Sequence, residues 1–321
     1  MARRVIIDTD TAGDDTQGIL LAALSDRIDV EALTICAGNV DFDDQVENAK
    51  YTLQLAGLGD EVPVYEGARS PLMKDHEHAE YVHGEGGLGG DLHPDTGIPS
   101  ADGYAPDYIV ETARENPGEV TLVCIAPLTN VALALQREPG LNDLLDEVVV
   151  MGGNVNCLGN VTPAAEYNFW VDPDAAKKVL AELDVTLVDW GLTVRDSVFE
   201  RETLDRIEAA ASDSEYAEFY DAITRSVREF NRETMGKDAT TQPDSLATAV
   251  LIEPDLVTEA DRYHVDVDER EGMTRGYTLV DEDSVTDGEA RTRVVESIDA
   301  AAFRRLFLDA VIHGDPDRSL T

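Results

Sequence analysis

The sequence predicts an α/β fold with an open, mostly parallel, Rossmann-like central sheet flanked by helices. Short β-branched runs alternate with helical patterns along the chain, which is typical of a parallel sheet with a helix after each strand. The apolar runs are continuous rather than alternating, as strands buried on both faces require. The 321 residues contain no internal repeat and no Ser/Gly-rich linker, so we expect one domain, residues 1–321.

Strand and helix patterns follow one another regularly in the first 191 residues. Strands are expected at RVIID (4–8), VEALTICAG (30–38), EVTLVCIAP (119–127), EVVVMGG (147–153) and VTLVDWG (185–191). Helices are expected at TQGILLAALSD (16–26), DDQVENAKYTLQLAG (43–57), LTNVALALQREP (128–139) and DPDAAKKVLAELD (172–184). In open parallel sheets ligands bind beyond the carboxyl ends of the strands, so the loops after these strands are the places to look for a site.

The C-terminal part forms a helical and hairpin excursion. Aromatic residues at helical spacing and a polar loop occupy 214–244. This segment is a candidate active-site lid, and an ordinary packed helical segment is the alternative. A helix (245–252), a hairpin (262–281) and an amphipathic helix (299–314) follow.

The composition excludes several classes of partner. The chain has 66 acidic and 25 basic residues, of which five are lysine, and a formal charge of −41. Such a surface stays hydrated in high salt and predicts a halophilic protein. It excludes nucleic acid and anionic membranes as partners, because both require positive surface. We expect a cytoplasmic location, since the start of the chain has no signal-like apolar region and no apolar run approaches roughly 18 residues.

Four aspartates crowd the end of the first predicted strand, in VIIDTDTAGDD. Asp8, Asp10, Asp14 and Asp15 lie there without a Lys or Arg in the segment. One or two of them could cap the following helix. Four carboxylates held this close must share protons or bind a cation, and all-oxygen ligands favour Ca²⁺ or Mg²⁺ over zinc. The sequence therefore predicts a metal site.

A phosphatase of the haloacid dehalogenase type is a rival interpretation, because that family also opens with strand-D-x-D. It uses the first aspartate as nucleophile and places Thr or Val two residues after the second, where this chain has Ala12. The phosphatase pattern also does not include the pair Asp14–Asp15.

The order of the remaining motifs distinguishes between these interpretations. D-x-D-x-x-x-D-D is followed by AGNV, HGEGGLGG, APLTNVALAL, GNVTPAAEYNFWVDPDAA and PDSLATAV. This series resembles the nucleoside hydrolase family, the inosine–uridine preferring N-ribohydrolases, over about residues 5–255. The resemblance implies the nucleoside hydrolase fold and hydrolysis of the N-glycosidic bond of ribonucleosides to free base and ribose. It also implies a homo-oligomer, a dimer or tetramer.

The resemblance further implies a calcium ion as cofactor. Its ligands would be Asp10, Asp15, the main-chain carbonyl of Ile125 and the distant Asp244. Calcium holds and polarises a water molecule, and Asp10 would act as the general base that activates it.

A second set of residues matches the positions that bind the sugar in this family. By resemblance, Asp14 faces the 2′-hydroxyl, Asp244 is shared between metal and 3′-hydroxyl, and His83 serves the 5′ side or the leaving base. The remaining members of the set are Asn39, Met151, Asn160, Glu166 and Asn168. Structural alternatives exist for four of these residues. Asn39 and Asn160 each follow a glycine and could simply form turns. Glu166 and Asn168 could simply be exposed at the surface.

The chain departs from the family pattern directly before Asp244. Many relatives have a histidine there that protonates the departing base, and this chain has Pro243. The candidates for that task are His83, Gln242, Tyr220, Arg228 and Arg232. The departure also leaves open a catalytically weak homologue that binds ribose or nucleosides.

Overall fold

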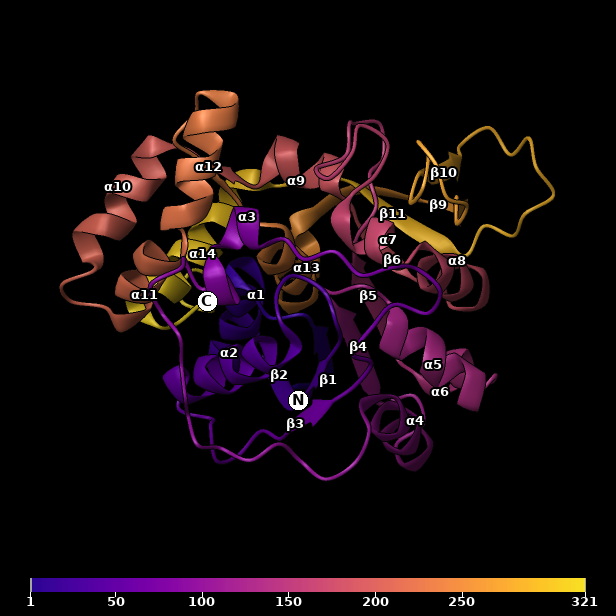
Figure 1. Ribbon diagram of the computed structural model, residues 1–321, viewed down its shortest axis with the longest axis horizontal. Coiled ribbons are helices and arrows are strands. Elements are labelled where there is room, and N and C mark those ends of the chain that lie inside the picture. The colour runs from indigo at the N-terminus through magenta and orange to yellow at the C-terminus, as the bar shows by residue number, and fades with distance from the viewer. Residues whose placement is uncertain (1, 321) are drawn as a thin grey trace.

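The computed structural model of the protein describes residues 2–320. Its main feature is a nine-stranded sheet (Figure 1). In spatial order the strands are β10 (Thr278–Asp281), β9 (Val257–Val267), β11 (Thr292–Ile298), β6 (Thr186–Val188), β5 (Glu147–Met151), β4 (Val120–Cys124), β1 (Arg3–Thr9), β2 (Ile28–Ile35) and β3 (Val64–Glu66). The seven strands from β11 to β3 pair in parallel, and β9 and β10 add antiparallel pairs at one edge. The predicted α/β fold is confirmed.

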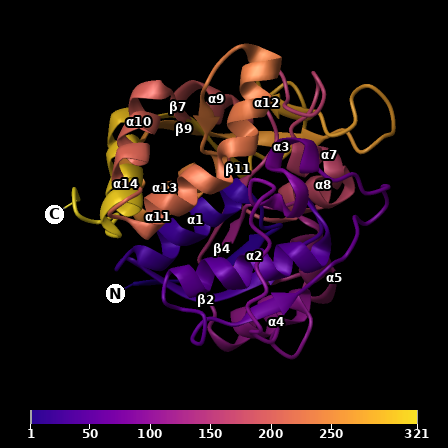
Figure 2. The same ribbon diagram turned by 60° about the vertical axis from the view of Figure 1, so that its left-hand side comes forward.

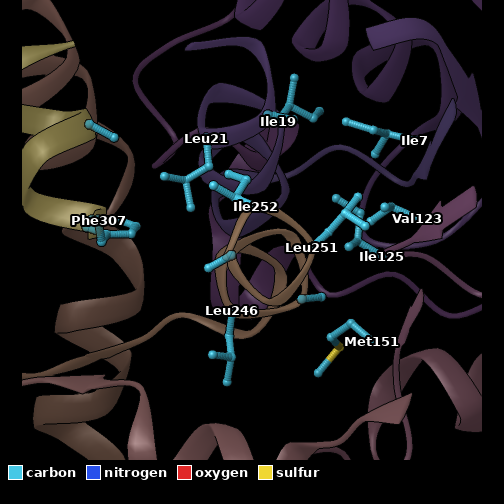
Figure 3. Packing of buried hydrophobic residues seen from close by; sticks show 14 of the residues in the cluster. Ile7, Ile19, Leu21, Val123, Ile125, Met151, Leu246, Leu251, Ile252 and Phe307 are labelled. Atoms are coloured by element: carbon cyan, nitrogen blue, oxygen red, sulfur yellow. The ribbon is translucent and has the colours of Figure 1, made fainter. Parts of the chain in front are cut away.

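Helices cover both faces of this sheet (Figures 1 and 2). One face carries α1 (Gly13–Leu24), α2 (Phe42–Leu55), α13 (Pro243–Ile252) and α14 (Ala300–His313), and the other carries α4 (Ala105–Glu115), α5 (Thr129–Arg137) and α8 (Pro173–Glu182). Neighbouring residues of β1 serve opposite faces, since Ile7 belongs to the first core and Ile6 to the second. In Figure 3, side chains from β1, β4 and α1 gather around α13. Burial on both faces explains the continuous apolar runs.

Further elements connect and extend these layers. They are α3 (Glu80–His83), η1 (Glu85–Gly87), α6 (Leu141–Leu144), α7 (Tyr167–Val171), α9 (Trp190–Asp196), β7 (Val198–Phe199), α10 (Arg201–Ala210), α11 (Glu215–Ile223), α12 (Arg225–Met235), β8 (Thr240–Thr241) and η2 (Pro254–Leu256). The 214–244 segment forms α11, α12 and β8, and α12 stands next to α3 in both views (Figures 1 and 2). Within residues 2–320 no helix combines the length and apolarity that crossing a membrane demands.

Candidate active site

A cavity of about 400 Å³ opens beyond the carboxyl ends of the central strands. Its wall includes loops that follow β1, β2, β4 and β5, which is where a parallel sheet places its ligands. Of the residues predicted from the sequence, the cavity is lined by Asp14, Asn39, His83, Ile125, Met151, Asn160, Glu166, Asn168 and Asp244. Asp10 and Asp15 are fully buried and lie behind that lining. The structure therefore gathers the predicted residues in one region, while the role of each remains a prediction.

Three carboxylates meet in this region. Oxygen atoms of Asp14, Asp15 and Asp244 all lie within 4.8 Å of one another, an arrangement that could hold a metal ion. Asp14 and Asp15 belong to the first turn of α1, whereas Asp244 belongs to the first turn of α13. The helices come close because α1 has a glycine at the contact: a Cβ at Gly18 would lie 3.1 Å from the carbonyl oxygen of Asp244.

Asp10 follows β1 directly and is not among the three carboxylates that meet within 4.8 Å. Its Oδ2 accepts a 2.8 Å hydrogen bond from the backbone N–H of Asn39, and its Oδ1 is buried without a hydrogen-bond partner. A glycine is required beside it, because a Cβ at Gly38 would lie 1.8 Å from that Oδ2. The AGNV motif thus supplies both the space and the donor that hold this carboxylate.

Burial and mutual repulsion oppose ionisation of these groups. Burial, followed by the charge of Asp14, raises the pKa of Asp15 to about 7. Burial, followed by the charge of Asp15, raises the pKa of Asp10 well above its ordinary value. Burial, followed by the charges of Asp14, Asp15, Asp10 and Glu166, also raises the pKa of Asp244 well above its ordinary value. A divalent cation would remove this repulsion.

Two buried oxygens also fit a metal ion. Oδ1 of Asp10 and Oδ1 of Asp14 are both buried without a hydrogen-bond partner. An unpaired buried acceptor costs about 1–3 kcal/mol, and hard cations prefer carboxylate and carbonyl oxygens. The residues present therefore fit a calcium or magnesium ion in their chemistry.

Glu166 and Asn168 are only 2% and 5% exposed, so surface exposure does not explain them. Glu166 caps α7 by accepting a hydrogen bond from the backbone N–H of Asn168 (2.8 Å), and it also accepts one from the backbone N–H of Gly153 (2.7 Å) outside that helix. Burial raises the pKa of Glu166 to about 7. Asn168 donates through Nδ2 to the carbonyl oxygens of Met151 (3.2 Å) and Ile125 (3.4 Å).

The other predicted sugar-side residues have contacts of their own. Nδ2 of Asn39 donates to Oδ2 of Asp15 at 3.3 Å. Oδ1 of Asn160 accepts the backbone N–H of Tyr167 at 2.9 Å. Nδ1 of His83 lies 3.6 Å from Oδ1 of Asp14, and the His83 side chain is 13% exposed. Each of these side chains reaches the cavity from a loop or a short helix.

The candidates for contacting the leaving base separate into two groups. His83, Tyr220 and Gln242 line the cavity. Arg228 and Arg232 do not line it, and both form ion pairs with Asp238. The two arginines therefore serve the structure of the α12 segment in this conformation.

Sequence reasoning missed three features of the site. The first is that position 38 must be glycine; the place of Gly38 in the AGNV motif was the signal that could have revealed it. The second is Gln17, a buried amide that lines the cavity one helical turn after Asp14. The third is the contact of Gln242 with Tyr220 and Thr240, for which nothing in the sequence spacing gave a signal.

Solved structures of nucleoside hydrolases share this architecture. A plant nucleoside hydrolase, the PpNRh1 enzyme, superimposes with a TM-score of 0.91 at 29% identity, covering 98% of this chain and 100% of the other. A purine-preferring ribonucleoside hydrolase from Gardnerella vaginalis superimposes with a TM-score of 0.86 at 27% identity, covering 96% and 98%. The fold is that of the nucleoside hydrolases.

Sequence comparison identifies the family. The family model described as inosine-uridine preferring nucleoside hydrolase matches residues 5–305. The pyrimidine-specific ribonucleoside hydrolase RihA of Citrobacter koseri is 35% identical over 306 residues, covering 94% of this chain and 96% of that protein. RihB of Escherichia coli, named likewise, is 32% identical over 310 residues, covering 96% and 97%. This chain belongs to the inosine-uridine preferring nucleoside hydrolase family and is a hydrolase acting on N-glycosyl compounds.

Proposed function

We propose that this protein is a calcium-dependent ribonucleoside hydrolase that releases free base and ribose, with Asp10 as the general base. The observation that carries the proposal is the convergence of Asp14, Asp15 and Asp244 within 4.8 Å in a chain of the nucleoside hydrolase family. Structural relatives named as purine-preferring and sequence relatives named as pyrimidine-specific support ribonucleosides as the substrate class.

Of the three carboxylates that meet within 4.8 Å, Asp15 and Asp244 would be ligands of the ion. The carboxylate of Asp10 and the carbonyl of Ile125 would complete the set. When bound, calcium supplies a positive charge that holds and polarises the attacking water. The unpartnered Oδ1 of Asp10 supports a group that can take up a proton. Its Oδ2 is fixed by Asn39, so the orientation of Oδ1 is set before the substrate arrives.

Ribose would bind between the carboxylates and the amide side chains. Asp14 and Asp244 accept hydrogen bonds from the 2′- and 3′-hydroxyls, while Asn39, Asn160 and Asn168 offer further polar contacts. Met151 packs beside the sugar. Asn168 is held by two main-chain carbonyls, and this pre-organisation supports a sugar site with little reordering on binding.

The charge of this pocket suits the transition state of glycoside cleavage. That state resembles an oxocarbenium ion, with positive charge at the anomeric carbon and the ring oxygen. Asp14 and the oxygens of buried Glu166 face such a charge, which favours it electrostatically. His83 would serve the 5′ side of the ribose or the base, and the α11–α12 segment (214–244) would close over the bound nucleoside.

The test is release of free base and reducing sugar from a panel of purine and pyrimidine ribonucleosides, in high salt with calcium. We expect release from at least one of them. Measurable nucleoside binding without release from any substrate would favour the weak, ligand-binding alternative. Release of phosphate from phosphomonoesters with magnesium, abolished by Asp8→Asn, would favour the phosphatase.

A further inference from the structure

Four polar side chains that line the cavity are not among those assigned to the ribose: Gln17, Tyr220, Thr240 and Gln242. They come from α1, α11 and the β8–α13 connection, and each is at most 2% exposed. Two of these elements, α1 and α13, also carry the carboxylates Asp14 and Asp244. With the ribose held at those carboxylates, the four side chains remain to contact the base.

Three of these side chains form a closed triangle of hydrogen bonds. Nε2 of Gln242 contacts the hydroxyls of Tyr220 and Thr240, each at 2.9 Å, and the two hydroxyls are 2.7 Å apart. If the amide were reversed, both hydroxyls would donate to its oxygen, and no proton would remain for the short contact between them. Nitrogen must therefore face the hydroxyls. Because the two hydroxyls lie close together, one N–H of the amide is shared between them, and one hydroxyl donates to the other. The proton of the remaining hydroxyl is free.

Either Tyr220 or Thr240 could carry the free hydroxyl proton. A ligand oxygen that becomes negative is bound best by the stronger donor of the two. A phenol is more acidic than an aliphatic alcohol. Tyr220 then accepts from Gln242 and from Thr240 while it donates outward, and hydrogen bonds arranged in a chain strengthen one another. Burial raises the pKa of Tyr220, so the phenol stays a neutral donor.

Gln17 supplies the opposite chemistry in the same cavity. Its Nε2 donates a hydrogen bond to Oγ1 of Thr16 at 3.1 Å. The Thr16 hydroxyl itself donates to the carbonyl oxygen of Gly13 at 2.6 Å, so it can only accept from Gln17. The free atom of the Gln17 amide is consequently the oxygen. This Oε1 is buried without a hydrogen-bond partner, which makes it an acceptor that a ligand N–H would satisfy.

We propose that Tyr220 and Gln17 bind the departing base: the Tyr220 hydroxyl donates to a carbonyl oxygen of the base, and Oε1 of Gln17 accepts an N–H of the same base. Gln242 and Thr240 are positioning residues that direct the phenol outward. This inference rests on the proposed function. Pro243 lines the cavity beside Gln242 and has no hydrogen-bond donor, so it cannot protonate the departing base. The inference therefore gives the stabilisation of that base to a neutral hydrogen-bond donor, Tyr220.

The step balances without an acid in the protein. The glycosidic C–N bond breaks with its electron pair moving onto the base, where it spreads to the carbonyl oxygen. Water forms the new C–O bond at the anomeric carbon, and Asp10 takes its proton. The Tyr220 hydrogen bond strengthens as negative charge grows on the carbonyl oxygen, and solvent protonates the base after release. An interaction that strengthens in the transition state raises kcat rather than lowering KM alone.

The first test compares uridine with 4-nitrophenyl β-D-ribofuranoside, whose leaving group is stable without help. Tyr220→Phe removes only the hydroxyl. We expect kcat/KM for uridine to fall about 100-fold, as on removal of one donor to a developing oxyanion, and that for the aryl riboside to change by less than about threefold on the same reasoning. An equal fall for both substrates would assign Tyr220 a structural role and overturn the proposal, as would an unchanged rate on uridine.

The second test uses 3-methyluridine, which lacks the N–H. The wild-type protein should prefer uridine by about tenfold or more, as expected when a buried acceptor loses its donor, and Gln17→Leu should abolish that preference. A preference that persists in Gln17→Leu would overturn the role of Gln17. Gln136→Leu, an exposed position on α5, is the matched control. If the wild-type protein cleaves neither nucleosides nor the aryl riboside, the proposed function itself is wrong, a result distinct from either outcome above.

Discussion

The backbone N–H of Asn39 donates a 2.8 Å hydrogen bond to Oδ2 of Asp10, and Oδ1 of Asp10 has no partner. One oxygen of this buried carboxylate is therefore fixed and the other is left free. This relationship links the loop after β2 to the loop after β1, and it supports the proposal that Asp10 takes up a proton.

Replacement of Asp10 by asparagine should remove activity and keep the fold. The Asn side chain can still accept the hydrogen bond from Asn39, but it cannot take a proton from water. We expect kcat to fall by about 10²–10⁴, the usual contribution of a general base. Ribose release measures the effect, and circular dichroism checks the fold. Near-native turnover in a folded variant would show that Asp10 is not the base.

Gly38→Ala should impair the enzyme through Asp10. The added methyl group would lie 1.8 Å from Oδ2 of Asp10, so the carboxylate or the loop must move. Displacement of a reacting group by about 1 Å can cost about 100-fold in rate, and overpacking costs about 1–3 kcal/mol of stability. Gly140→Ala is the control, because its nearest neighbour is the flexible end of Glu138. Wild-type kinetics in Gly38→Ala would contradict the close contact.

Asp189→Asn should stabilise the protein at neutral pH. Burial raises the pKa of Asp189 to about 6 from 3.8. As pH rises from about 4 to 6, the unfolded chain loses this proton while the folded chain keeps it, so wild-type stability falls in this window. Asparagine keeps an oxygen for the N–H groups of Val155 and Gly191 and does not ionise.

We therefore expect the unfolding free energy of Asp189→Asn to exceed that of the wild-type protein above pH 6 by up to about 3 kcal/mol. The difference should disappear below about pH 4, where both side chains are neutral. Denaturant unfolding at pH 4 and pH 7 measures it in the same buffer series. A variant that is less stable than the wild-type protein at both pH values would contradict the assigned cause.

High salt should stabilise the folded state. The formal charge is −41, and repulsion over that surface is screened within about 10 Å at 0.1 M salt but within about 3 Å at 1 M. We expect Tm to rise between 0.1 and 2 M KCl by on the order of 10 °C, which corresponds to a few kcal/mol for a chain of this size. Scanning calorimetry at pH 7 gives the value. A Tm that is constant or falls with salt would contradict a halophilic surface.

The sequence allowed the fold to be predicted where hydrophobic runs are long and regular. The helix containing Leu21 and the strand containing Val123 are examples, because burial on both faces leaves an uninterrupted apolar pattern. β11 (Thr292–Ile298) was missed. It inserts between β6 and β9 and is stabilised by strands distant in sequence rather than by its own pattern. Short elements such as β3 (Val64–Glu66) carry too few residues to show a period.

The candidate site could be predicted where a motif names the residue and its chemistry. Asp14, Asp15 and Asp244 were named from motifs, and the structure brings them together across more than two hundred residues. Gln17 could not be predicted, because a glutamine on a helix is usually exposed. Its burial and the direction of its free oxygen, which follows from the hydrogen bond to Thr16, are specified only by the folded structure.

The central claim is that one calcium ion at the carboxylate group serves the hydrolysis. The direct measurement is a calcium titration of chelator-treated protein in high salt, followed in parallel by calorimetry and by base release from the best nucleoside of the panel. We predict one ion per chain, no activity without it, and the same half-saturation for binding and for activity. Asp244→Asn should weaken both together. Full activity after chelation, or calcium binding that leaves activity unchanged, would contradict the claim.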